Sequence, residues 1–104
     1  MNKYIVVTTL CDKEEIANKI IDTVLQNHLA SGAQISNVHS KYWWNDKYEE
    51  CDEIKIEFRT KSNLFNEIKN VIKEIHDYEV AEISSYEITD ANQEFLNWVD
   101  ENTK

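Results

Sequence analysis

The stretch Lys-Tyr-Trp-Trp-Asn-Asp-Lys-Tyr-Glu-Glu at residues 41–50 says most about how this chain folds. The Asn-Asp pair at its centre favours a tight turn, because both side chains hydrogen-bond to nearby backbone and tolerate left-handed dihedral angles. Three aromatic residues precede this turn, and the alternating run Ile-Lys-Ile-Glu-Phe follows it at residues 54–58. The stretch therefore predicts a long β-hairpin. Adjacent side chains of a strand point to opposite faces, so Trp43 and Trp44 cannot both enter one core.

The composition is typical of a globular protein, and the length predicts a single domain over residues 1–104. Of the 104 residues, 41% are apolar and 30% are charged, and one Gly and no Pro argue against a flexible linker. The formal net charge of -9 predicts repulsion from phosphates and anionic lipids. We therefore expect neither a nucleic acid nor a membrane as partner. An acidic surface that only keeps the protein soluble is the alternative meaning of this charge.

Apolar runs and cysteine spacing indicate the compartment. No run approaches the length of a transmembrane helix, and the apolar N-terminal run is too short for a secretory signal. A cytoplasmic location is therefore expected. Cys11 and Cys51 lack the spacing of a zinc or redox motif, so we expect free thiols in a reducing cytosol.

Hydrophobic periodicity predicts an alternation of strands and helices along the chain. We expect strands at residues 4–10, 33–46, 48–60 and 80–88, and helices from 12 to about 28, from 62 to 75, and over a short segment that begins at Asp90 or Asn92. The order βαββαβ plus a terminal helix, with right-handed crossovers, predicts a ferredoxin-like α/β sandwich. The first two helices would then cover one face of the sheet.

Several local features of these elements also follow from residue type. Asp12 is the expected N-cap of the first helix, and Glu15 completes a capping box with it. Ser62 is expected to cap the second helix. The first strand of the hairpin is predicted to be irregular around residues 36–37.

The pattern also predicts assembly. Ile5 and Val6 are neighbours in a strand, so they cannot both point at the helices, and an uncovered apolar sheet face marks an interaction site. The long hairpin also leaves strand edges that need a partner. We expect a homo-oligomer of closed cyclic symmetry. A monomer with one unusually apolar strand is the alternative.

The chain resembles the CutA divalent-cation-tolerance family over nearly its whole length. The matching pieces, in the family's order, are Val-Val-Thr-Thr at 6–9 with Asp12 and Glu15, Tyr-Trp-Trp at 42–44 with Lys47 and the Glu pair at 49–50, Lys61, His-Asp-Tyr-Glu-Val at 76–80 with Glu-Ile at 82–83, and Phe-Leu-Asn-Trp at 95–98. The chain departs from the family at Asp77 and Ala81, where the family usually has Pro.

This resemblance implies a ferredoxin-like subunit, a tight homotrimer, a cytoplasmic location and no established enzymatic activity. We expect no required cofactor. Members of the family are linked to tolerance of divalent metals, notably copper. Their trimer is also similar to that of the PII signalling proteins. A PII-like sensor module, which binds a small molecule between subunits and passes its state to another protein, is therefore the second hypothesis. A scaffold protein without any ligand is the third.

Polar and aromatic residues could line a cleft between subunits and bind a small ligand there. An imidazole, a phenol, a carboxylate and an ammonium group near an aromatic wall suit a small polar molecule. The residues that we predict for this cleft are Tyr42, Trp44, Lys61, His76, Tyr78 and Glu79. The alternative is structural: His76 caps the second helix, where a cation is favoured, and Glu79 pairs with Lys61.

Thiolate and imidazole groups are the candidate ligands for copper or another divalent cation. We single out Cys11, His39 and His76, and the remaining thiol and imidazole belong to Cys51 and His28. Their spacing does not preorganise a site, so ligands would have to converge through the fold or across the trimer. The chain has no Gly-rich phosphate loop, nucleophile elbow or His-Glu-x-x-His motif, so we do not expect an enzyme.

Overall fold

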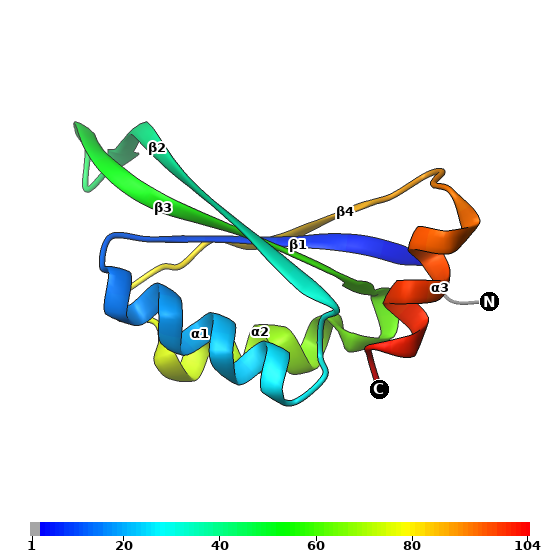
Figure 1. Ribbon diagram of the computed structural model, residues 1–104. Helices are drawn as coiled ribbons and strands as arrows, with labels where there is room; N and C mark the ends of the chain where they lie inside the picture. Colours follow the sequence, from blue (N-terminus) through cyan, green and yellow to red (C-terminus); the bar gives the residue numbers. More distant parts are fainter. Residues whose placement is uncertain (1–2) are drawn as a thin grey trace.

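The protein folds in the order βαββαβα, as predicted, and residues 3–104 are described by a computed structural model (Figure 1). The strands are β1 (Tyr4–Cys11), β2 (Gly32–Trp44), β3 (Lys47–Lys61) and β4 (Ile83–Glu87), and the helices are α1 (Glu14–Gln26), α2 (Phe65–Ile75) and α3 (Gln93–Glu101). A single 3₁₀ turn, Ser62–Leu64, leads directly into α2. The ferredoxin-like fold class is therefore confirmed.

The four strands form one antiparallel sheet in the order β2-β3-β1-β4, with β1 and β3 in the middle. Helices α1 and α2 lie side by side on one face of it (Figure 1). Alternate residues of β1 and β3 point at these helices and meet their apolar stripes. The core between sheet and helices includes Ile5, Val7, Cys11, Ala17, Ile20, Val24, Ile56, Phe58, Ile68 and Ile72.

The turn of the hairpin has the predicted residues and geometry. Asn45 and Asp46 have φ values of 50° and 62°, and Trp44 pairs with Lys47 across them. A two-residue loop with both φ values positive matches the right-handed twist of the strands that it joins. The register then runs without interruption from Gly32 to Trp44, so the predicted irregularity at residues 36–37 is wrong. Backbone pairing with the long, regular β3 keeps this segment extended.

The hairpin extends far beyond the rest of the sheet. The last pair between β1 and β3 joins Cys11 to Ile54. Beyond it, residues 38–44 and 47–53 pair only with each other within the described chain, and we call these two segments the ribbon. A two-stranded ribbon is marginally stable by itself. Near its tip Trp43 and Tyr48, which are 73% and 62% exposed, stack with ring centroids 5.6 Å apart.

The face of the sheet away from α1 and α2 is less apolar than we predicted. Val6 points to this face, yet it is buried, as is Val99 of α3. The hydroxyl of Tyr4 donates to Asp100 at 2.8 Å, which helps to hold α3 at the end of the sheet where β1 begins (Figure 1). The register places charged residues over much of the remainder, including Lys55 and Glu57. The largest exposed aromatic surface therefore lies on the ribbon.

The predicted N-caps of α1 and α2 are wrong, whereas Asn92, one of the two predicted starts of the third helix, holds the cap position of α3. The first helical bond of α1 joins the Ala17 N–H to the Lys13 carbonyl, so α1 begins at Glu14 and Lys13 holds the cap position. No side chain caps this end of the helix. Asp12 therefore lies one residue too early. Ser62 opens the 3₁₀ turn and does not cap α2, whose cap position holds Leu64. The negative charges of Glu14 and Glu15 in the first turn instead stabilise the positive end of the α1 dipole.

The end of α1 lies close to the predicted position. His28 has a φ of 55°, its N–H donates to the carbonyl of Leu25, and the N–H of Leu29 donates to the carbonyl of Val24, both at 3.0 Å. This is the Schellman arrangement that satisfies free carbonyls at the end of a helix. Strand β4, in contrast, begins at Ile83 and not at Val80, because its pairing with β1 begins only at Thr9.

A matched pair of valines tests the core. Val24 is fully buried between α1 and the sheet, whereas Val80 is exposed in the loop before β4. We expect Val24→Ala to lower the free energy of unfolding by about 2–3 kcal/mol, because it removes buried methyl groups and leaves a cavity. Val80→Ala should change it by less than about 0.5 kcal/mol. Denaturant titration would measure both, and equal losses would contradict this description of the core.

Candidate functional site

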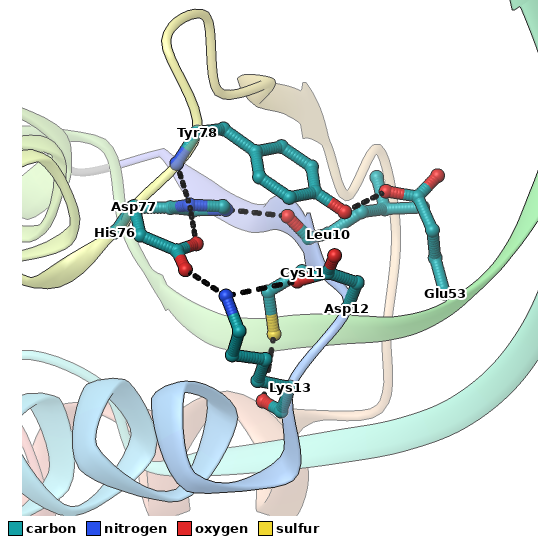
Figure 2. A network of polar contacts seen from close by, with 8 residues as sticks. All are labelled: Leu10, Cys11, Asp12, Lys13, Glu53, His76, Asp77 and Tyr78. Carbon is teal, nitrogen blue, oxygen red and sulfur yellow. Dashed lines mark hydrogen bonds and ion pairs between the residues drawn. The ribbon is translucent and has the colours of Figure 1, made fainter.

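His76 is held firmly at the end of α2. Its backbone N–H donates to the carbonyl of Ile72 at 2.8 Å, so it is the C-cap residue, as the structural alternative predicted. Its side chain is 1% exposed, Nε2 donates to the carbonyl of Leu10 at 2.6 Å, and Nδ1 accepts from the backbone N–H of Tyr78 at 3.1 Å (Figure 2). These partners specify the tautomer with its hydrogen on Nε2. Neither ring nitrogen is left for a ligand in this arrangement.

Tyr78 packs on His76 and reaches the ribbon. The two ring centroids are 4.5 Å apart with an interplanar angle of 52°, and the Tyr78 hydroxyl donates to Oε2 of Glu53 at 2.8 Å (Figure 2). Burial, and secondly this bond to a carboxylate, raise the pKa of Tyr78 well above its ordinary value. The hydroxyl therefore keeps its proton and remains a donor at physiological pH.

A second contact ties the same loop to the start of α1. The ammonium group of Lys13 donates to the carboxylate of Asp77, and this bond lowers the pKa of Asp77 below its ordinary value (Figure 2). Cys11 lies fully buried beside it, with Sγ 3.6 Å from the Lys13 carbonyl oxygen. Burial raises the pKa of the Cys11 thiol. A buried thiol of this kind is held in its unreactive form.

Lys61 lies at the opposite end of the sheet. It pairs with Tyr4, whereas the contact of His76 is with Leu10, six residues further along β1. At about 3.3 Å per residue, these two points are roughly 20 Å apart. Lys61 is buried, and its ammonium group donates to the carbonyl of Lys104 at 2.9 Å. The alternative pairing of Lys61 with Glu79 is not among the ion pairs of residues 3–104.

Tyr42 and Trp44 lie on a third part of the molecule, the ribbon. The register places both on one face of it, near Cys51. The Tyr42 hydroxyl is 3.6 Å from Sγ of Cys51, and this contact is the main cause that raises the pKa of Tyr42 to about 12. Of the predicted cleft residues, a single chain thus brings His76 and Tyr78 into contact, with the exposed Glu79 next to them in the chain, and places Tyr42 and Trp44 together on the ribbon.

His39 is the accessible member of the proposed metal ligands. It lies on the ribbon with a 51% exposed side chain, with Nδ1 2.7 Å from Asp52 and Nε2 3.1 Å from Glu50. Asp52 first, and then Glu50, raise the pKa of His39 above its ordinary 6.5. A hollow of about 480 Å³ lies beside it, with Asp12 and Glu53 also in its wall. Within residues 3–104, no group of three or more His, Cys, Asp or Glu side chains is placed to hold a metal ion.

Sequence reasoning did not identify three residues that hold this site together. Glu53, Asp77 and Lys13 each contact a partner far away in the chain, with separations of 25 residues for Tyr78–Glu53 and 64 for Lys13–Asp77. No local pattern marks such pairs. The position of Glu53 immediately before the alternating run at residues 54–58 was a weak signal for its role.

Comparison with known proteins agrees with this fold and these motifs. Residues 4–102 match the family described as CutA1 divalent ion tolerance protein. The chain belongs to this family. The divalent-cation tolerance protein CutA of Pyrococcus horikoshii is 37% identical over 100 residues, which cover 96% of this chain and 97% of that protein.

Solved CutA1 structures have the same fold. The crystal structure of CutA1 from Pyrococcus horikoshii aligns with a TM-score of 0.90 and 34% identity, covering 96% of this chain and 98% of that chain. A protein from Archaeoglobus fulgidus, described as the periplasmic divalent cation tolerance protein CutA, aligns with a TM-score of 0.94 and 28% identity over 97% and 99% of the two chains. The resemblance noted in the sequence is therefore confirmed. Within residues 3–104, no helix has the length and apolarity needed to cross a membrane.

The carboxylates around His39 predict a pH-dependent contribution to stability. A raised pKa in the folded state means that the protonated ring is favoured there, so its stabilisation is complete below pH 6.5 and is lost as pH rises through the folded pKa. NMR titration should give His39 a pKa above 6.5 in the wild type, and a lower value in Asp52→Asn. The loss of stability caused by His39→Gln should also be larger at about pH 5.5 than at about pH 9. An equal loss at both pH values would contradict the geometry.

Proposed function

We propose that this chain is a non-enzymatic, homotrimeric protein of divalent-metal tolerance, and that copper(II) is the ion it binds. Its membership of the CutA1 divalent ion tolerance family over residues 4–102 is the observation that carries this proposal. The name of the relative from Pyrococcus horikoshii points the same way. The lack of a catalytic motif supports a role without chemistry, as does the engagement of both His76 ring nitrogens in backbone contacts.

The ribbon supports the trimer. It exposes Trp43 and Tyr48, and no third strand from the described part of the chain lies beside it. Such surfaces favour contact with another chain. The separate positions of Lys61 and His76 support it as well. Because they lie at opposite ends of one sheet, a shared cleft would need Lys61 from one copy and His76 from another. Closed cyclic symmetry allows such a cleft to repeat at each interface.

Sedimentation equilibrium would test the trimer. We expect a particle of three chains at micromolar concentration, because a large buried aromatic contact outweighs the entropy lost on association. Trp43→Ala should shift the particle towards single chains. Trp98→Ala is the matched control, since Trp98 is also partly exposed but lies on α3, away from the ribbon. A wild-type protein that sediments as one chain would overturn the trimer. An equal effect of both variants would contradict the proposal that the ribbon forms the interface.

The environments of the three proposed copper ligands differ. Cys11 belongs to the buried core, and the His76 ring is buried with both nitrogens engaged, whereas His39 is half exposed beside two carboxylates. An ion that arrives from solvent would therefore meet His39 first. Copper(II) accepts imidazole and carboxylate ligands together, and binding would displace a proton from the ring. Cys11 and His76 would join only after a local rearrangement at the end of β1.

Equilibrium dialysis with copper(II) would test this assignment. We expect saturable binding of about one ion per chain, weaker at low pH because the ring must lose its proton. His39→Ala should weaken binding about tenfold or more, by loss of a ligand. His28→Ala is the control, because that imidazole is exposed elsewhere, with Nδ1 3.2 Å from the Asn102 carbonyl oxygen. Weak uptake of many ions, equal in all variants, would contradict a specific site.

A PII-like sensor module is the alternative function. Exposed Tyr42 and Trp44 on the ribbon, and exposed Glu79 beside Tyr78, support it, because aromatic and carboxylate groups suit a small polar ligand. A saturable thermal shift with a nucleotide or another metabolite, and none with copper, would favour this alternative. If no compound causes a thermal shift, the scaffold hypothesis is favoured.

We place the protein in the cytoplasm, where the two free thiols would remain reduced. Cell fractionation would test this placement. Recovery from the periplasm, the compartment named for the relative from Archaeoglobus fulgidus, would overturn it.

A further inference from the structure

The ribbon leaves the sheet at Glu53. Ile54 is the last β3 residue that pairs with β1, and Glu53 is the first that pairs only with its neighbour on β2, Val38. No third strand supports the ribbon within the described residues. Two strands alone twist and bend easily. Side-chain contacts at the base must therefore set the direction in which the ribbon points.

Tyr78 is the residue that makes such a contact from the body of the subunit. Its hydroxyl donates to Glu53 at 2.8 Å, and its backbone N–H donates to His76, whose ring donates to the carbonyl of Leu10 in β1 (Figure 2). The carbonyl of Leu10 belongs to the sheet itself. A chain of three hydrogen bonds thus connects the end of β1 to the base of the ribbon. The stacking of the two rings restricts the Tyr78 side chain further.

We propose that Tyr78 is a positioning residue, which fixes the direction of the ribbon through Glu53 and so prepares the ribbon to contact a second copy of the chain. The contact with a second copy rests on the proposed trimer, whereas the effect of Tyr78 on the direction of the ribbon does not. The acceptor is an ionised carboxylate, and hydrogen bonds of this kind are about twice as strong as neutral ones. The loop that carries Tyr78 is also fixed by Lys13 through Asp77. The ribbon is thereby coupled both to the connection between β1 and α1, where Lys13 lies, and to the loop between α2 and β4.

Hydrogen exchange on the full-length protein would test whether Tyr78 fixes the ribbon through Glu53. Tyr78→Phe removes only the hydroxyl, and we expect amides of the ribbon, residues 38–44 and 47–53, to exchange about tenfold faster, as for the loss of one charge-assisted bond. Amides of α1 should be unchanged. Tyr86→Phe is the matched control, because the Tyr86 hydroxyl also donates to a carboxylate, that of Glu57, but within the sheet. This control should leave exchange in the ribbon unchanged.

A second variant guards against an indirect effect. Glu53→Gln keeps an oxygen that accepts the hydrogen bond but removes its charge, so exchange in the ribbon should lie between the wild type and Tyr78→Phe. The proposal is overturned if Tyr78→Phe leaves exchange in the ribbon at the wild-type rate, or if Tyr86→Phe accelerates it equally. It is also overturned if exchange in α1 rises by the same factor, since the effect would then be global.

Sedimentation of the same variants separates this proposal from the trimer. If the wild type is a trimer, Tyr78→Phe should raise its dissociation constant about tenfold, because the ribbon must be ordered again on association. An unchanged constant would overturn the link to assembly. If the wild type sediments as a single chain, the trimer fails, whereas the exchange data still decide whether Tyr78 positions the ribbon.

Discussion

The length of β3 relative to β1 is the constraint on which the rest of this structure depends. Strand β3 has 15 residues and β1 has 8, so nearly half of the long hairpin has no third strand beside it among residues 3–104. Pairing within the ribbon satisfies only the backbone groups that face the other strand, so its outer edges stay unpaired within the described residues. The aromatic side chains near its tip are exposed as well. The exposed aromatic surface, the support for a trimer and the role of Tyr78 all follow from this mismatch.

The end of β1 shows how residues suggestive of ligand binding can serve the fold. Both ring nitrogens of His76 are used in backbone contacts, and the hydroxyl of Tyr78 is used at the base of the ribbon. Where the family usually has Pro, Asp77 instead holds its loop through the exposed ion pair with Lys13. Exposed pairs contribute little to stability singly. Here the pair acts together with the buried His76 contacts on the same loop.

The acidic charge and the positions of the thiols and imidazoles bear on the metal proposal together. With a net charge of -9 the protein attracts cations in general, so weak uptake of a divalent ion needs no dedicated site. Specific binding requires ligands of suitable type that meet without strain. His39 is reachable but already shared between two carboxylates, whereas Cys11 and His76 are buried at the end of β1. A specific site therefore depends on rearrangement or on a second copy.

The sequence by itself determined the local features: the hairpin and its Asn-Asp turn, the order of the elements, the end of α1 near His28, and the family. The hairpin, its turn and the elements depend on residues close together in the chain, where periodicity and turn chemistry act directly, and the family shows in the order of short motifs along the chain. Only the tertiary structure decided the start of β4, the absence of a cap at Asp12, and the separation of Lys61 from His76. It also decided the Tyr78–Glu53 contact. These features depend on which strands pair and in which register, and this is settled by burial over the whole fold.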